Sequence, residues 1–423
     1  MDRLIIHGGT PLYGEVEISG SKNAALPILA ATILATEPVK ISNLPGLNDV
    51  TTMTSLLSRL GSHIVLDGTP YSMNAEVNSN GIDNFQADQD LVRAMRASIL
   101  VLGPLLARFG QANVALPGGC AIGVRPIDFH VKGLRALGAE VEIIDGCIKA
   151  RCHGRLRAGI VEFDTISVTG TENILMAATL ADGVTTIKNA AREPEIEDLA
   201  KFLTTMGAKI RGAGSHTITV EGVTALGGGE HHVLPDRIEA GTYLAGGALT
   251  RGRIRVNKIA PEHLLSLLIK LAEAGAKLSI GDDWVELDMA KGRLQAINIC
   301  TGPYPAIATD MQAQLMAMNL LSEGRSQITE TVFENRFMHV QEMLRMGADI
   351  NLQNNTAICT GVKKLMGAVV KATDLRASAG LVLAALAAEG QTSITHIYHI
   401  DRGYACIEDK FLQLGAAIER VLE

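Results

Sequence analysis

The sequence predicts an α/β protein with two domains, each built from three repeated units of helices and strands. Three observations lead to this prediction. A short phrase built around glycine occurs six times, an apolar helical segment precedes each copy, and the 423 residues exceed the usual size of one domain. Six copies divide most simply into two domains of three.

The repeated phrase marks the place where an amphipathic helix ends and a strand begins. Its copies read SRLGSHIVL, RALGAEVEI, TTMGAKIRG, AEAGAKLSI, LRMGADINL and LQLGAAIER. The six glycines are 68 to 77 residues apart, at Gly61, Gly138, Gly207, Gly275, Gly347 and Gly415. This period is much longer than that of solenoid repeats, which favours compact domains over an elongated array.

An Ala/Leu-rich segment upstream of each phrase predicts a buried helix, followed by a strand with alternating apolar residues. Examples are ILMAATLADGVTTIKN and LVLAALAAEGQTSITH. Glycines that would stop these helices stand at Gly110, Gly183, Gly252, Gly324 and Gly390. Each unit is therefore expected to run as helix, strand, loop, second helix and further strands.

Composition argues against several classes of protein. The net charge is −7, from 38 basic and 45 acidic residues, which disfavours a nucleic-acid-binding surface. No apolar stretch reaches the roughly 18 residues that span a bilayer and no signal segment is recognisable, so we expect a cytoplasmic protein. The six cysteines lack the paired spacing of a disulfide framework or zinc site, and we expect most of them to be buried as small apolar side chains.

Polar and charged residues recur in the first turn of each predicted apolar helix. The six turns read GSKNAALP, DLVRAMRAS, GTENILMA, PDRIEAGT, ATDMQAQL and ATDLRASA. Free backbone N–H groups and the positive dipole end make helix N-termini attractive to anions, and lysine or arginine strengthens such a site. Several converging turns therefore predict a site for a phosphorylated or carboxylated substrate.

Single residues of these turns also permit structural interpretations. Asp310 and Asp374, taken one at a time, are predicted to cap their helices. Pro27 is unfavourable deep in a helix, so it predicts an irregular first turn that holds Lys22 and Asn23. A ligand or a buried acidic partner best explains the arginines that oppose the helix dipole. These arginines are Arg96, Arg237 and Arg376.

A second recurring position is the loop after the next strand, and it also carries reactive and cationic residues. They are Cys120, Arg125, Arg192, Arg336 and Arg402. In the stretch PGGCAIGVR, Cys120 stands among three glycines, which permit the backbone angles of a clamp loop. Its thiol can act as a nucleophile or as a general acid. Nearby arginines would lower its pKa and bound phosphate would raise it, so both roles stay open.

Other catalytic patterns are absent from the sequence. It contains no GxGxxG after a strand, no GxxxxGK[ST], no HExxH and no GxSxG. His130, His399 and Asp401 could be arranged as a triad on paper. Because single histidines beside apolar residues are mostly structural, we expect the two histidines to be structural.

With these motifs in place, the chain resembles the enolpyruvyl transferase family, and in it the UDP-N-acetylglucosamine 1-carboxyvinyltransferases, over its whole length. The resemblance rests on SGSKNAALPILAA, MRAS, LPGGCAIGVRP, NAAREPEIEDLA, LPDRIEAGTYL, TDMQAQ, TVFENRFMHV, ATDLRAS and YHIDRGY. It implies two inside-out α/β barrel domains, each of three repeated units with internal helices. The first domain would span 22–234, and the second 1–21 with 235–423, because the first strand joins the C-terminal domain. The active site would lie in the cleft between them.

The resemblance also implies an activity. The enolpyruvyl group of phosphoenolpyruvate would be transferred to the 3-hydroxyl of UDP-N-acetylglucosamine through a tetrahedral intermediate, with release of phosphate. This is the first committed step of peptidoglycan biosynthesis. No metal or organic cofactor is implied, no nucleic acid or membrane is a partner, and we expect a monomer. A fosfomycin-type epoxide phosphonate would bind covalently to Cys120.

The resemblance assigns roles to individual residues. Cys120 would protonate the vinyl carbon and form an adduct with phosphoenolpyruvate, Asp310 would act on the sugar hydroxyl, and Lys22, Arg125 and Arg402 would hold the phosphate and carboxylate. The remaining substrate-binding residues would be Asn23, Arg96, Pro126, Ile127, Asp128, Phe129, Thr165, Ile166, Ser167, Val168, Val332, Asp374 and Arg376. Thr165 departs from the family, where related sequences often have a lysine.

Two alternatives remain open at this level. A shikimate-pathway enolpyruvyl transferase would share the repeats and the anion clamp, but it lacks the glycine-flanked cysteine loop. A catalytically silent sugar-nucleotide sensor on the same scaffold would bind ligand without turnover. The presence of Cys120, Asp310 and Arg402 favours the carboxyvinyltransferase over both.

Overall fold

The structure is a computed structural model that describes residues 2–87, 89–116 and 127–422. The described residues form two compact units. The N-terminal unit takes those between 20 and 234, and the C-terminal unit takes those of 1–19 and 235–423. Each unit contains three four-stranded sheets.

The sheets of the N-terminal unit repeat one arrangement, in which the first pair of strands is parallel and the other two pairs are antiparallel. In spatial order they are β14 (Gly229–His232), β3 (Val39–Leu44), β5 (Ser72–Asn78) and β4 (His63–Thr69); β6 (Gln86–Ala87), β7 (Gln111–Ala115), β9 (Cys147–Arg151) and β8 (Glu140–Ile144); and β10 (Ile160–Glu162), β11 (Val184–Lys188), β13 (Thr217–Glu221) and β12 (Lys209–Arg211).

The sheets of the C-terminal unit follow the same arrangement. They are β2 (Tyr13–Glu17), β15 (Arg253–Asn257), β17 (Trp284–Asp288) and β16 (Lys277–Ile280); β18 (Ile299–Cys300), β19 (Arg325–Thr329), β21 (Thr356–Thr360) and β20 (Asp349–Gln353); and β22 (Val369–Lys371), β23 (Gln391–Thr395), β1 (Arg3–His7) and β24 (Ala417–Val421). The N-terminal strand β1 therefore lies between β23 and β24, as the family resemblance predicted.

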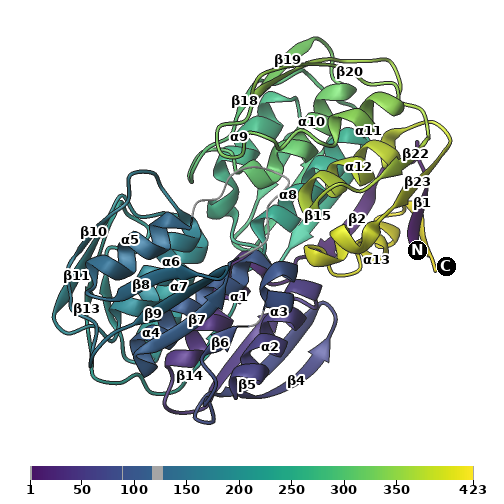
Figure 1. The fold of residues 1–423 in the computed structure, drawn as a ribbon. Helices are drawn as coiled ribbons and strands as arrows, with labels where there is room; N and C mark the ends of the chain where they lie inside the picture. Colours follow the sequence, from purple (N-terminus) through teal and green to yellow (C-terminus); the bar gives the residue numbers. More distant parts are fainter. Residues whose placement is uncertain (1, 88, 117–126, 423) are drawn as a thin grey trace. The chain divides into compact units, whose positions relative to one another are not determined.

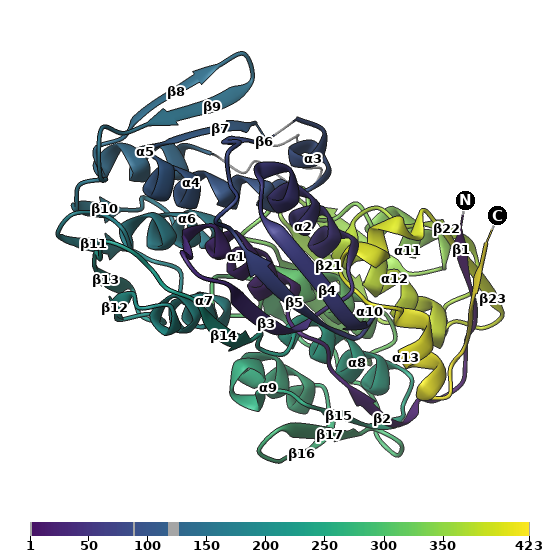
Figure 2. The same ribbon diagram turned by 90° about the horizontal axis from the view of Figure 1, so that it is seen from below.

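Three apolar helices form the interior of each unit, as Figures 1 and 2 show for each unit separately. Most of their residues are buried on every side, which is why their sequences are apolar all round rather than striped. In the N-terminal unit they are α1 (Lys22–Ala31), α4 (Leu102–Phe109) and α6 (Val168–Ala178). In the C-terminal unit they are α8 (Arg237–Leu249), α10 (Gln312–Leu320) and α12 (Leu375–Ala387).

The second helix of each repeat is amphipathic and has a partly exposed face. These helices are α2 (Asn48–Leu60), α5 (Asp128–Ala136), α7 (Pro194–Thr205), α9 (Leu265–Glu273), α11 (Val340–Arg345) and α13 (Ile407–Gln413). Shorter helical segments are α3 (Gln89–Ala94), η1 (Thr32–Leu34), η2 (Arg96–Val101), η3 (Pro261–Leu264), η4 (Thr309–Met311) and η5 (Ile397–Arg402). The predicted order of helix, strand, second helix and further strands is thus confirmed.

The glycines of the repeated phrase end these second helices in the left-handed conformation. All six have φ between 81° and 112°, where a side chain would be strained. Gly252 differs from the other four predicted stops: its neighbour Arg251 takes the left-handed conformation with φ 55°. A Cβ on Gly252 would lie 1.9 Å from the carbonyl oxygen of Leu12, so close backbone approach requires this glycine.

Two local predictions are wrong. Helix α1 begins at Lys22 and includes Pro27, so no irregular first turn holds Lys22 and Asn23; burial of almost the whole helix outweighs one missing hydrogen bond. Among the described cysteines, only Cys359 is buried, and Cys300 is exposed. Strand alternation explains the latter, because Ile299 takes the inward position of β18 and leaves the outward one to Cys300.

Candidate active site

Asp310 is the centre of a charged cluster in the C-terminal unit. It lies in η4, directly before α10, and its side chain is 23% exposed. One carboxylate oxygen is 2.8 Å from Nη1 of Arg336, and the other accepts a hydrogen bond of 3.3 Å from Nε of Arg376. The prediction that Asp310 is a helix cap is wrong. Its carboxylate is instead held between two guanidinium groups and remains accessible to a ligand.

Arg376 is the more deeply buried of the two arginines in this cluster, with 1% of its surface exposed against 5% for Arg336. Besides Asp310 it contacts Asp236, at 3.9 Å, and the face of the Tyr404 ring, at 5.4 Å. Burial by itself would lower the pKa of Arg376, but Tyr404, Asp310 and Asp236 outweigh it and raise the pKa above its ordinary value. Of the two explanations that the sequence left open for this first-turn arginine, a ligand or a buried acidic partner, the structure shows the acidic partner.

The two other aspartates beside Arg376 are helix caps. Asp374 accepts hydrogen bonds from the backbone N–H groups of Arg376 and Ala377, at 2.9 and 3.0 Å. Asp236 caps α8 in the same way, from Ile238 and Glu239. The structural interpretation therefore holds for Asp374, and the cap fixes the backbone that presents Arg376 to Asp310.

Arg402 ends η5 and is half-buried. Asp401 and His399 lie beside it, and His399 is one of the two histidines predicted to be structural. The pKa of His399 is lowered, first by burial and then by the charge of Arg402, so this ring is neutral at pH 7. Asp401 forms a two-pronged ion pair with Arg420, at 2.6 and 3.1 Å, which gives it a structural role.

Lys22 is a buried cation of the N-terminal unit. Its ammonium lies 3.3 Å from the carboxylate of Asp49 in α2, and both residues are less than 10% exposed. Asn23, next to it at the start of α1, is half-buried. Sequence reasoning missed Asp49, which no motif distinguishes from the other acidic residues at the start of an amphipathic helix.

The residues predicted to contact the sugar nucleotide gather at two helix N-termini of the same unit. Ile127, Asp128 and Phe129 begin α5, while Thr165 and Ile166 precede α6. Ser167 caps α6 by accepting a hydrogen bond from Gly170 N–H, at 3.1 Å, and Val168 is the first helical residue. Thr165 is exposed, and the rings of Phe129 and Phe163 meet edge to face.

A buried asparagine ties these helix N-termini together. Asn173 in α6 accepts a hydrogen bond of 2.6 Å from Gly103 N–H, donates to the carbonyl of Ile99 at 3.1 Å, and lies 3.0 Å from Nδ1 of His130 in α5. Burial, and then the charge of Arg96, lower the pKa of His130 to about 4. His130 is therefore neutral at pH 7, and its Nδ1 can accept a hydrogen bond from the Asn173 amide. Asn173 thereby links α4, α5, α6 and η2, which begins at Arg96.

Three predicted site residues, Cys120, Arg125 and Pro126, lie outside the described residues. Of the others, Lys22, Asn23, Arg96 and the two helix N-termini belong to the N-terminal unit, and Asp310, Val332, Asp374, Arg376 and Arg402 belong to the C-terminal unit. Inside each unit the structure brings predicted residues together. That both sets form one cleft stays a prediction.

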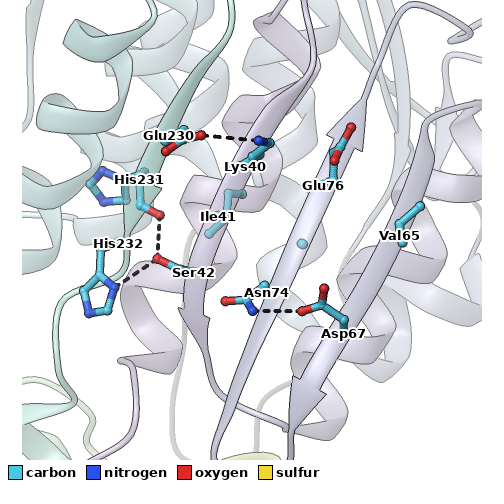
Figure 3. A pocket seen from close by; sticks show the side chains of 11 residues that line it. Lys40, Ile41, Ser42, Val65, Asp67, Asn74, Glu76, Glu230, His231 and His232 are labelled. Atoms are coloured by element: carbon cyan, nitrogen blue, oxygen red, sulfur yellow. Dashed lines mark hydrogen bonds and ion pairs between the residues drawn. The ribbon is translucent and has the colours of Figure 1, made fainter.

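A hollow on the sheet of β14, β3, β5 and β4 includes none of these residues. Its polar side chains pair with one another: Ser42 with His232 at 2.9 Å, Asn74 with Asp67 at 2.8 Å, and Lys40 with Glu230 at 3.4 Å (Figure 3). Throughout the described ranges, no three His, Cys, Asp or Glu side chains are grouped as a metal ion requires. Nor does the described part of the chain contain a helix long and apolar enough to cross a membrane.

Comparisons with known proteins agree with this architecture. The family model described as EPSP synthase (3-phosphoshikimate 1-carboxyvinyltransferase) matches residues 6–411. The chain is 59% identical over 421 residues to "UDP-N-acetylglucosamine 1-carboxyvinyltransferase" of two Coxiella burnetii strains, Dugway 5J108-111 and RSA 493 / Nine Mile phase I, covering 100% of this chain and 96% of each relative.

Two solved structures resemble the chain as a whole. The enolpyruvyl transferase NikO from Streptomyces tendae has a TM-score of 0.89 at 24% identity, with 99% of each chain covered. EPSP synthase from Acinetobacter baumannii has a TM-score of 0.74 at 16% identity, with 100% of each chain covered. At these identities the likeness concerns the fold, and it confirms the predicted fold class of two inside-out α/β barrels.

Proposed function

The chain belongs to the EPSP synthase family of enolpyruvyl transferases, and from that premise we propose that it transfers the enolpyruvyl group of phosphoenolpyruvate to the 3-hydroxyl of UDP-N-acetylglucosamine. The observation that carries the proposal is the 59% identity, over the whole chain, to relatives named UDP-N-acetylglucosamine 1-carboxyvinyltransferase. The product feeds peptidoglycan synthesis, and the enzyme works in the cytoplasm as a monomer.

Asp310 is the group that acts on the sugar hydroxyl. Arg336 and Arg376 favour its ionised form and fix the direction of both oxygens, so the carboxylate can accept the proton of the 3-hydroxyl as the sugar oxygen attacks C2 of phosphoenolpyruvate. Cys120 delivers a proton to C3 of the same double bond. The tetrahedral phospholactoyl intermediate then loses a proton from C3 and its phosphate, which restores the double bond.

Cations neutralise the two anionic ends of phosphoenolpyruvate. Lys22, Arg125 and Arg402 hold its phosphate and carboxylate and balance the charge that collects on the phosphate as it leaves. The contact of Lys22 with Asp49 supports this role, because it fixes a long flexible side chain before substrate arrives. Asn23 adds a polar contact beside Lys22.

The sugar nucleotide lies against the helix N-termini of α5 and α6. Their backbone N–H groups and dipoles favour the diphosphate, and Arg96 and Arg125 supply positive charge. The residues that take part in this contact are Pro126, Ile127, Asp128, Phe129, Thr165, Ile166, Ser167 and Val168. Val332 contacts the sugar nucleotide from the C-terminal domain, while Asp374 and Arg376 support the intermediate and product release. The domains 22–234 and 1–21 with 235–423 close around both substrates.

The experiment is a phosphate-release assay with phosphoenolpyruvate and UDP-N-acetylglucosamine. Wild type should release phosphate only when both are present, and Cys120→Ala should lose this activity. A fosfomycin-type epoxide phosphonate should add its mass to the peptide that carries Cys120. Turnover that depends on shikimate 3-phosphate would make the chain a shikimate-pathway enzyme, and calorimetric binding without phosphate release would make it a sugar-nucleotide sensor.

A further inference from the structure

Glu330 has a buried carboxylate that accepts four hydrogen bonds around Asp310. It follows β19 and is 1% exposed. Its Oε1 accepts from the hydroxyl of Thr301 and the backbone N–H of Val332, both at 2.8 Å, and from the backbone N–H of Phe333 at 3.1 Å. Its Oε2 accepts one bond, of 2.8 Å, from the hydroxyl of Thr309. Such burial keeps Glu330 itself away from any substrate.

The Thr309 hydroxyl passes this orientation on to Asp310. A hydroxyl has one proton, and because Thr309 gives it to Glu330, its lone pairs are left to accept. Nη1 of Arg336 donates to this oxygen at 2.9 Å, and the same nitrogen lies 2.8 Å from the Asp310 carboxylate. The result is a continuous chain of bonds that joins Glu330 to Asp310. Arg336 donates to Thr309, which donates on to Glu330, and Arg336 also donates to Asp310.

The backbone on both sides of this chain is anchored as well. The N–H of Glu330 donates to the carbonyl of Asn355 at 2.8 Å, and the Asn355 side chain donates back to the Glu330 carbonyl at 3.0 Å. The side chain of Gln312 in α10 donates to the Arg336 carbonyl at 3.2 Å. The backbones of Glu330 and Arg336 are therefore anchored. The Thr309 hydroxyl then orients the Arg336 guanidinium by accepting its hydrogen bond.

We propose that Glu330 is a positioning residue for the transfer step: through Thr309 and Arg336 it sets the direction of the Asp310 carboxylate, and through its other oxygen it fixes the turn that carries Val332. This inference rests on the proposed function, in which Asp310 accepts the proton of the sugar hydroxyl. It assigns to Glu330 and Thr309 an effect on turnover that neither exerts by contact with substrate.

The variant Glu330→Gln distinguishes the role of Oε1 from that of Oε2. The amide oxygen should take the Oε1 position, because three donors meet there, and the amide NH₂ then faces Thr309. Thr309 must accept this bond and can no longer donate it, which disturbs its contact with Arg336. Because Val332 N–H keeps its acceptor, we expect kcat to fall about tenfold while KM for UDP-N-acetylglucosamine changes less than about threefold.

Thr309→Val removes the hydroxyl that links Glu330 to Arg336, and Thr309→Ser keeps it. We expect the valine variant to lose about tenfold in kcat and the serine variant to stay within about threefold of wild type. In the double variant with Glu330→Gln, kcat should remain within about threefold of the poorer single variant, because both changes break one chain of bonds.

Thr329→Val is the matched control. Thr329 precedes Glu330, and its hydroxyl bonds that of Thr356 at 3.1 Å without leading to Asp310. This variant should turn over like wild type. Wild-type kcat in Thr309→Val, failure of serine to rescue, or full additivity with Glu330→Gln would overturn the positioning role. A wild-type protein that releases no phosphate would overturn the proposed function instead, and melting curves of all variants would reveal unfolding.

Discussion

The region around Asp310 and the region around Asn173 organise helix N-termini by different means. Around Asp310, full charges face each other, with Arg336 and Arg376 on one carboxylate. Around Asn173, neutral groups are bonded: an amide, two backbone groups and a histidine kept neutral by burial. A carboxylate that must take a proton needs a fixed field, whereas helix ends that receive a diphosphate need only fixed backbone N–H groups.

The largest effect is expected from removing the charge at the centre of the charged region. Asp310→Asn keeps the shape of the side chain but cannot accept the hydroxyl proton, and the two arginines then lack their anion. We expect kcat to fall by about 10²–10⁴-fold, the range typical of a lost general base. Steady-state phosphate release measures the loss, and calorimetry should show that UDP-N-acetylglucosamine still binds. Activity above one tenth of wild type would remove Asp310 from the transfer step.

Stability should depend strongly on the more deeply buried arginine of the same region. Arg376→Leu removes the counter-charge of buried Asp236 and leaves Asp310 with Arg336 alone, and breaking such a buried pair costs about 3–5 kcal/mol of unfolding free energy. Denaturant unfolding would measure the change. Arg293→Leu is the control, since its pair with Glu323 is mostly exposed and such pairs contribute about 0–1 kcal/mol. Equal losses of unfolding free energy in the two variants would contradict the claim that the buried ion pairs of Arg376 stabilise this region.

The neutral region should respond through binding as well as stability. Asn173→Ala leaves the Gly103 N–H buried without this partner, which costs about 1–3 kcal/mol, whereas the Ile99 carbonyl keeps its bond from Leu102 N–H. Because α5 and η2 lose their link to α6, we expect KM for UDP-N-acetylglucosamine to rise more than kcat falls. Asn173→Asp offers a second measurement, since it keeps the acceptor for Gly103 N–H and loses the donor. A fall in kcat at unchanged KM would contradict this division of roles.

The sequence predicted the repeats because glycine with positive φ and all-apolar helices leave a signature in the chain itself. It also predicted that Arg376 needs a ligand or a buried acid, since an arginine in a first helical turn opposes the dipole. It could not distinguish Asp310 from Asp374, because a cap and a held carboxylate have the same local sequence. It missed Asp49 as a partner of Lys22 and the relay through Glu330 and Thr309, because these pairs lie 21 or more residues apart and only the fold joins them.

The smallest expected effect is a change in how the unfolding free energy depends on pH, and it comes from one buried histidine in each region. Burial lowers the pKa of His130 in the neutral region and of His339 in the charged region to about 4, against 6.5 for an ordinary histidine. The unfolded chain therefore binds protons below pH 6.5 that the folded chain binds only near pH 4. Stability that is present above pH 6.5 is lost as the pH falls toward 4, by about 3 kcal/mol for each histidine.

His130→Asn removes one of these titrations and keeps a side-chain oxygen near Nδ1, where Asn173 donates. We expect the unfolding free energy of this variant to fall less than that of wild type between pH 6.5 and 4, by up to about 3 kcal/mol. His339→Asn is the comparison: both ring nitrogens of His339 lack a hydrogen-bond partner among the described residues, so the variant should flatten the pH profile without keeping any bond. Urea unfolding at a series of pH values measures both. A wild-type slope in the His130 variant would mean that this ring is charged in the folded protein, and the neutral character assigned to the Asn173 region would then be wrong.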